Sequence, residues 1–116
     1  MAKNMIIMNR GDSAELNLFI DDEYSSDGLY LLDSHDAVFL GVMMPNMSFE
    51  DAIIKKKYVL YDQREDKSIL IRLSPADTLD LAPGIYYYAI KLVKNVGTEH
   101  EEVKTIINKT KFVLND

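Results

Sequence analysis

SPADTLDLAPGIYYYAIKL, residues 74–92, places a helical turn, a tight turn and a strand in close succession. Ser74 can cap a helical turn that Pro75 opens, because proline already has the backbone angle of a first helical residue. Pro83-Gly84 then supplies a fixed backbone angle followed by a permissive one, as a sharp turn requires. We therefore expect a short helical crossover near residues 75–80 that leads directly into a strand.

The tyrosines of this strand indicate the kind of fold. Tyr86 comes just after the turn and Tyr88 follows two residues later, so both side chains should point to the same face. This spacing is typical of the tyrosine corner of immunoglobulin-like domains, in which the tyrosine hydroxyl donates a hydrogen bond to upstream backbone. The pattern predicts an all-β, immunoglobulin-like antiparallel β-sandwich of about seven strands, with the ring of Tyr86 inside it.

Alternation of apolar and polar residues marks the other strands. Residues 14–20 alternate, which predicts a core face made of Ala14, Leu16, Leu18 and Ile20. Residues 37–44 are almost continuously apolar, so we expect a strand covered on both faces, or one whose outer face is hidden by the long connection at 21–36. The other expected elements are a first strand at 5–8, a helical turn at 48–52, a strand at 53–61, a charged hairpin turn at 62–66, a strand at 67–73, a turn at 94–98 that uses Asn95 and Gly97 at positive φ, and a last strand at 101–114.

The chain has 116 residues and no cysteine. This length suits one domain, 1–116, which can bury about two thirds of the surface that the unfolded chain exposes. Without cysteine there is no disulfide, no thiolate nucleophile and no zinc site with sulfur ligands. No apolar segment is long enough for a signal-peptide core or a membrane span, so we expect no membrane insertion.

Charge is unevenly distributed along the sequence. The net charge is −6, which argues against nucleic-acid binding, because phosphate contacts depend on clustered Lys and Arg. Residues 11–54 contain ten acidic residues and no Lys or Arg. This span predicts a distinctly negative surface, which either meets a basic partner or simply maintains solubility.

The sequence offers no set of residues that predicts catalysis. His35 and His100 are the only histidines, both lie in predicted loops, and neither has the spacing of a helical metal pair. No serine lies in a Gly-x-Ser-x-Gly motif, and nothing indicates paired carboxylates across a cleft. We expect no enzyme activity, no cofactor and no catalytic, cofactor-binding or metal-binding residue; a small hydrolase with a histidine base is the residual alternative.

Asp21-Asp22-Glu23, Asp27 and Gly28 form an acidic group that calcium could in principle use. Calcium takes about six to eight oxygen ligands from flexible loops, and the spacing of these residues does not match the EF-hand loop. We interpret the group as an ordinary polar turn after a strand.

Exposed aromatic rings would favour carbohydrate binding. Alternation predicts that Tyr86 and Tyr88 point inward, which leaves Tyr87 alone on the outer face. Phe19 is a further candidate for an exposed ring. Three methionines at a strand end can form an apolar patch suited to assembly or to core filling: Met43, Met44 and Met47. A carbohydrate- or ligand-binding β-sandwich that uses Tyr87, Phe19 or the long connection is therefore an alternative function.

Several motifs occur together along the chain: Ile6-Ile7 in an apolar strand, Gly11-Asp12 before an alternating strand that ends at Asp21-Asp22, LSPADT at 73–78, and PGIYYY at 83–88. With these motifs, most of the chain resembles the small immunoglobulin-like domains of tailed-bacteriophage tail and baseplate proteins, notably the N-terminal domain of upper baseplate proteins and related prophage products. The departure lies between Glu23 and Asp51, where such domains usually have a shorter connection.

This resemblance implies a non-enzymatic structural or assembly protein of a phage or prophage tail or baseplate, acting through protein–protein contacts. Its partners would be other tail or baseplate proteins or further copies of itself, and it would reside in the virion after synthesis in the host cytoplasm. Edge strands would be the natural docking sites, because their unpaired backbone groups can accept a strand from a partner. The resemblance brings no catalytic residues with it.

Overall fold

The computed structural model describes residues 5–116, and the fold is all-β as predicted. The strands are β1 (Ile6–Asn9), β2 (Ala14–Leu18), β3 (Ala37–Met43), β4 (Ile54–Tyr58), β5 (Ile69–Leu73), β6 (Gly84–Lys94) and β7 (Glu102–Asn115). The helical segments are η1 (Phe49–Asp51), η2 (Leu60–Asp62) and α1 (Pro75–Thr78). The crossover expected near 75–80 and the helical turn expected at 48–52 are thus confirmed.

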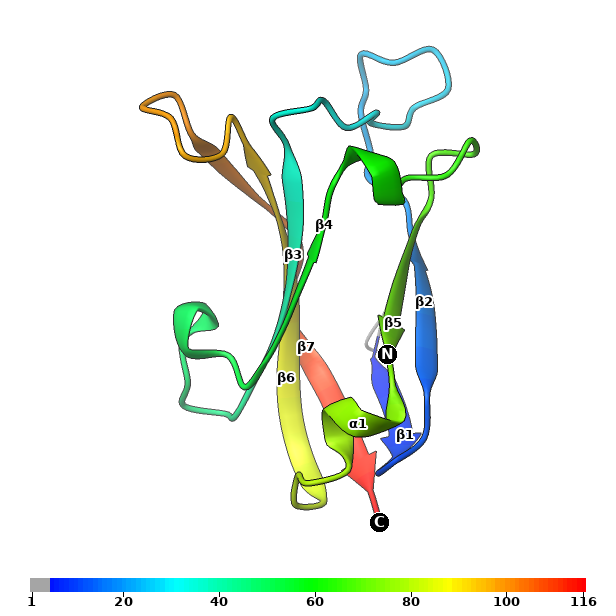
Figure 1. Cartoon of the computed structure of the whole chain (residues 1–116), viewed down its shortest axis with the longest axis vertical. Helices are drawn as coiled ribbons and strands as arrows, with labels where there is room; N and C mark the ends of the chain where they lie inside the picture. The colour runs from blue at the N-terminus through cyan, green and yellow to red at the C-terminus, as the bar shows by residue number, and fades with distance from the viewer. Residues whose placement is uncertain (1–4) are drawn as a thin grey trace.

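The strands form two sheets that face each other, as Figure 1 shows. One sheet has the order β1-β7-β6-β3-β4 and the other contains β2 and β5. β1 and β7 pair in parallel, from Ile6 opposite Phe112 to Asn9 opposite Asn115. The expectation of a purely antiparallel arrangement is therefore wrong at this point. The turn after β1 carries the chain into the other sheet, so β1 does not form a hairpin with β2 and lies beside the last strand instead.

The connection between β4 and β5 also differs from the prediction. The sequence predicts a hairpin through the charged turn at 62–66. Instead β4 pairs with β3 and β5 pairs with β2, so this connection crosses from one sheet to the other. β4 ends at Tyr58 and η2 follows it. Alternation identifies a strand and its buried face, but it does not specify the neighbouring strand, which explains the error.

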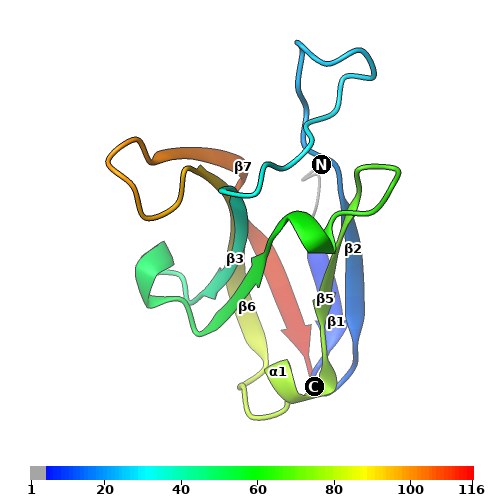
Figure 2. The same cartoon turned by 45° about the horizontal axis from the view of Figure 1, so that its top comes forward.

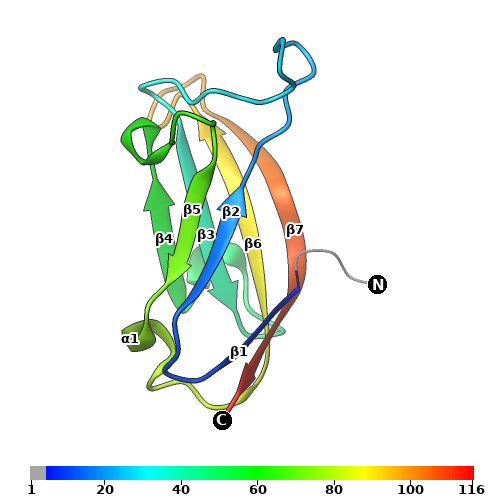
Figure 3. The same ribbon diagram turned by 90° about the vertical axis from the view of Figure 1, so that its right-hand side faces the viewer.

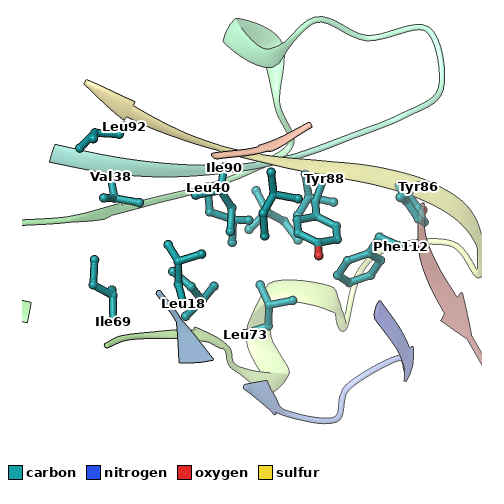
Figure 4. Close-up of a cluster of buried hydrophobic side chains, with 14 of the residues drawn as sticks. Leu18, Val38, Leu40, Ile69, Leu73, Tyr86, Tyr88, Ile90, Leu92 and Phe112 are labelled. Atoms are coloured by element: carbon teal, nitrogen blue, oxygen red, sulfur yellow. The ribbon is translucent and has the colours of Figure 1, made fainter. Parts of the chain in front are cut away.

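The tyrosine corner is present as predicted. The Oη atom of Tyr86 donates a hydrogen bond to the carbonyl oxygen of Ala82 at 2.5 Å, and its side chain is only 4% exposed. The ring packs edge-to-face against Phe112, with the ring centroids 6.4 Å apart. Figure 4 shows both rings beside Tyr88, among the aliphatic side chains that fill the space between the sheets. The corner thus fixes the turn before β6 to the core.

Asp77 and Thr78 fasten α1 to its surroundings. The carboxylate of Asp77 accepts hydrogen bonds from the backbone N–H of Ser74 at 2.7 Å and from Nζ of Lys56 on β4 at 3.0 Å. Partial burial raises the pKa of Asp77, but these hydrogen bonds lower it more, so the pKa lies below its ordinary value. The buried hydroxyl of Thr78 accepts a hydrogen bond from the N–H of Gly11 at 3.0 Å. α1 therefore joins β4 to the turn after β1.

β3 is covered on both faces, which is one of the two alternatives that the sequence predicts. The cover on its outer face comes from the η1 segment, not from the long connection at 21–36. Gly41 makes this close approach possible, because a Cβ atom there would lie 2.9 Å from a ring carbon of Phe49. Met43 is buried in this contact and Met47 packs against it, while Met44 is 48% exposed. Two of the three methionines therefore fill a small core.

The predicted core face of β2 is only partly buried. Leu18 and Ile20 are fully buried, whereas Ala14 and Leu16 are half-buried. The difference arises because β2 pairs with β5 along one edge and with no described strand along the other. Its open edge borders the groove that is described below.

Candidate functional site: an acidic loop end above a side groove

Three connections lie at one end of the molecule, namely residues 19–36, 59–68 and 95–101 (Figures 1 and 2). Twelve of the nineteen acidic residues fall within 21–36, 60–67 and 95–102, together with only two Lys or Arg residues. We call this region the acidic loop end. Six of the ten acids of residues 11–54 lie here and are joined by acids from two later loops, whereas Asp12, Glu15, Glu50 and Asp51 lie elsewhere.

Gln63 connects two of the three loops. Its Oε1 atom accepts a hydrogen bond from the N–H of Leu32 at 2.8 Å. Its Nε2 atom donates to the carbonyl oxygens of Tyr30 at 2.9 Å and of Lys67 at 3.0 Å. One amide side chain thus satisfies three backbone groups, which are separated from it by up to 33 residues in the sequence.

An ion pair between Lys67 and Asp27 joins the same two loops a second time. The Nζ atom of Lys67 lies 3.0 Å from a carboxylate oxygen of Asp27. Hydrogen bonds from the hydroxyl of Ser25, from Lys67 and from the N–H of Leu29 lower the pKa of Asp27 to about 2. The turn predicted around Asp27 is therefore present. The carboxylate of Asp27 accepts hydrogen bonds from its own loop and forms an ion pair with Lys67.

The third loop is tied to the first through His35, and Lys94 at the end of β6 contacts Tyr30 of the first loop. The hydroxyl of Tyr30 donates to the carboxylate of buried Asp36 at 2.6 Å; burial and this hydrogen bond raise the pKa of Tyr30. Nζ of Lys94 lies 4.9 Å from the centre of the Tyr30 ring. The backbone N–H of Val96 donates to the carbonyl oxygen of His35 at 2.9 Å. All three loops are thus held as one unit.

The turn at 94–98 adopts the conformation that the sequence predicts. Asn95 has φ 54° and Gly97 has φ 78°, both in the left-handed region. His100 is exposed, and its Nε2 atom lies 3.5 Å from the carboxylate of Glu99. His35 is also exposed, but it lies on a different connection, between β2 and β3.

The acidic group at 21–27 does not form a cation cage. The carboxylate of Asp22 accepts a hydrogen bond from the N–H of Tyr24 within the same turn. Across residues 5–116, no three or more His, Asp or Glu side chains gather closely enough to hold a metal ion. The geometry of these residues is that of a polar turn.

A groove runs along the side of the molecule between β2 and β7. Figure 3 shows that β1 joins β7 only near its C-terminal end, which leaves the rest of β7 facing β2. Residues 16–21 form one wall and residues 104–107 form the other, and the groove has a volume of about 470 Å³. Among residues 5–116, no strand pairs with this edge of β7 between residues 102 and 111. The groove is therefore bordered by two open strand edges.

The groove continues upward into the acidic loop end. This upper part has a volume of about 480 Å³ and shares Ile20, Asp21 and Lys104 with the lower part. Its walls combine acids, aromatic rings and lysines: Asp21, Asp22, Glu23, Tyr24, Tyr30, Lys94 and Lys104. Acids lie along one side and lysines along the other.

Exposed aromatic rings occur mainly around this end. Tyr24 is 91% exposed, Tyr61 on η2 is 94% exposed, and Phe19 beside the groove is 46% exposed. Tyr87 lies on the outer face of the five-stranded sheet as predicted, but it is half-buried and Nζ of Lys109 lies 5.7 Å from its ring centre. Phe19 directly follows β2, whereas Met43, Met44 and Met47 lie at and just after the end of β3.

Sequence reasoning missed Gln63, Lys67 and Tyr30 as the residues that organise this end. Gln63 and Lys67 lie at the two sides of the turn at 62–66, for which the sequence shows no signal other than its charged residues. Their partners lie in another loop, so no local spacing could have identified them. The positive φ of Lys67, 68°, marks a special backbone position, but lysine gives no sequence signal for it.

No helix among the described residues has the length and apolar character needed to cross a bilayer. The chain matches no known family model, and no curated protein or solved structure shows significant similarity to it.

Proposed function

We propose that this chain is an immunoglobulin-like assembly module of a phage or prophage tail or baseplate, which acts through protein–protein contacts and not as an enzyme. Support for the immunoglobulin-like assignment comes from the tyrosine corner and from the two facing sheets. The attribution to a phage tail rests on the motif resemblance, chiefly LSPADT and PGIYYY.

The groove between β2 and β7 is the observation that carries a role in assembly. Two open strand edges face each other across it, and unpaired backbone groups of this kind accept an added strand. Phe19 and the half-buried Ile106 provide apolar contacts along its length. An extended segment of a neighbouring tail protein would gain main-chain hydrogen bonds and bury these side chains.

Binding to the products of the adjacent genes tests this role. The purified chain is mixed with each neighbouring tail or baseplate protein and analysed by size-exclusion chromatography with light scattering. We expect a stable complex with one of them, and we expect Phe19→Ala to weaken it about tenfold. Val103→Ala, on the outer face of β7, is the matched control and should leave binding unchanged. Adjacent genes of purely metabolic character, or no binding to any tail protein, would contradict the proposal.

Carbohydrate binding is the second candidate, and the upper groove supports it. Tyr24 offers an exposed ring for stacking on a sugar, next to the carboxylates of Asp21 and Glu23, which can accept hydrogen bonds from hydroxyl groups. A glycan array tests this function directly. Binding that is lost in Tyr24→Ala and kept in Tyr61→Ala would support it, and an array without hits would exclude it.

A further inference from the structure

The outer face of the five-stranded sheet, which is turned away from β2 and β5, carries five lysines. They are Lys55 and Lys57 on β4, Lys91 on β6, and Lys109 and Lys111 on β7. None of them forms an ion pair with another residue of the described range 5–116. We call this surface the lysine face.

Aromatic rings, not acids, are the neighbours of these lysines. Three of the Nζ atoms lie 4.5 to 5.9 Å from a ring centre: Lys57 over Phe39, Lys91 over Phe49, and Lys109 over Tyr87. An aromatic ring does not neutralise a lysine, so the five lysines give this face an excess of positive charge, which the exposed Glu50 and Asp51 of η1 offset only in part.

An apolar row lies beside these charges. Ile7, Val113 and Ile85 are directly opposite one another on β1, β7 and β6. Ile7 is 60% exposed and Ile85 is 52% exposed, while the next row contains Tyr87 opposite Lys111. A row of exposed apolar side chains bordered by charge is typical of a protein interface.

The complementary surface is the acidic loop end of the same protein. Glu23 and Glu65 are exposed there and form no ion pair within residues 5–116, and Tyr24 and Tyr61 add two almost fully exposed rings. Hydrogen bonds and the Lys67–Asp27 ion pair already hold the loops in place, so little further ordering is needed on binding. The two surfaces occupy different sides of one molecule and can meet only between molecules.

We propose that the lysine face binds the acidic loop end of a second copy of this chain, head to tail. This inference rests on the proposed assembly function and adds a second contact to it, between copies of this chain. Because the two contacting surfaces differ, each dimer still has one free lysine face and one free acidic loop end. Association can therefore continue into a ring or a filament. Charge complementarity also makes the association weaker at high salt.

Light scattering of the purified chain over a range of concentrations and salt tests the proposal. We expect association at low salt that decreases with added salt. Glu23→Lys with Glu65→Lys reduces the negative charge of the acidic loop end, and Lys55→Glu with Lys111→Glu reduces the positive charge of the lysine face, so each double variant alone should associate about tenfold more weakly or worse. An equimolar mixture of the two should restore association, because each variant then offers a complementary surface to the other.

Two controls distinguish the loss of the proposed contact from an effect of net charge and from a loss of folding. Asp12→Lys with Asp80→Lys adds the same charge at the opposite end of the molecule, where both acids are exposed, and should leave association unchanged. Circular dichroism and thermal melting establish that every variant is folded. Ile85→Ser, which alters only the apolar row, should also weaken association.

The outcomes separate this inference from the proposed function. A chain that stays monomeric, reversals that do not change association, or a mixture that fails to restore it would each overturn the head-to-tail contact. Binding of the monomeric chain to a tail protein would leave the proposed function standing. Self-association with no binding to any tail protein would support the contact and contradict only the assignment to a tail.

Discussion

The tyrosine corner and the acidic loop end are both held by side-chain hydrogen bonds, but the bonds span very different distances along the chain. At the corner, Tyr86 reaches back four residues to Ala82, and Asp77 reaches back three residues to Ser74. At the acidic loop end, Gln63 reaches 31 residues to Leu32, and Lys67 reaches 40 residues to Asp27. The conformation of the tyrosine corner thus depends on residues nearby in the sequence, whereas that of the acidic loop end depends on residues in a distant segment.

Mutations in the two regions should therefore have different effects on stability. The corner is part of the main core through Tyr86 and Phe112, so damage there lowers the stability of the whole molecule. The loops of the acidic end contribute few buried side chains, so damage there opens the loops and leaves the two sheets intact. Four changes test this contrast.

Phe112→Ala should have the largest effect. The ring is fully buried against Tyr86, and its removal leaves a cavity between the sheets, so the free energy of unfolding should fall by about 3 to 5 kcal/mol. Urea denaturation followed by circular dichroism measures it. Val113→Ala, one residue further on the outer face, is the control and should cost under about 1 kcal/mol. Equal losses for the two variants would mean that the ring does not anchor the corner.

Tyr86→Phe keeps the ring and removes only the hydroxyl. The carbonyl of Ala82 then loses its partner, which should cost about 1 to 2 kcal/mol of global stability. Tyr87→Phe is the matched control on the next residue, and it should be nearly neutral. Should both variants unfold at the same urea concentration as the parent, the corner hydrogen bond contributes nothing to stability.

Gln63→Ala should act locally. The N–H of Leu32 and the carbonyl oxygens of Tyr30 and Lys67 lose their partner, so amide exchange at Leu32 should become faster. Global stability should fall by about 1 kcal/mol at most, because water can reach these groups once the loop opens. Glu65→Ala, in the same connection, is the control. A uniform increase in exchange over both sheets would contradict a local role.

Acidification should produce the smallest effect at the acidic loop end. Folding lowers the pKa of Asp27 from 3.8 to about 2, so its carboxylate stabilises the fold above pH 3.8, and this contribution disappears as the pH falls through about 2. Asp33 and Asp66 also have lowered pKa values, held down by hydrogen bonds from His35 and Ser68 respectively. Carboxyl NMR titration of Asp27 checks this. A midpoint near 3.8 would show that Lys67 and Ser25 do not engage it.

The same contrast explains how much of the molecule the sequence could predict. The helical turn after Ser74, the inward direction of Tyr86 and Tyr88, and the turn at Asn95 all depend on neighbours within a few residues, and all are confirmed. These features are local, so the propensities that create them are visible in a short window.

Features that depend on remote partners were not predictable. The parallel pairing of β1 with β7 and the change of sheet after Tyr58 depend on which strands meet, and alternation carries no information about that. The cover on β3 likewise depends on the missing side chain of Gly41, whose neighbour Phe49 arrives from the following segment. The three-way linkage by Gln63 belongs to the same class.

The pairing of β1 with β7 has a mechanical consequence. Because the two strands run in the same direction, from Ile6 beside Phe112 to Asn9 beside Asn115, tension applied to the two ends of the chain pulls them past each other along their length. Every hydrogen bond between them is then loaded in shear at the same moment, and none can be opened before its neighbour. A tensile force would therefore meet its main resistance at the seam between the first and last strands, with both sheets still intact.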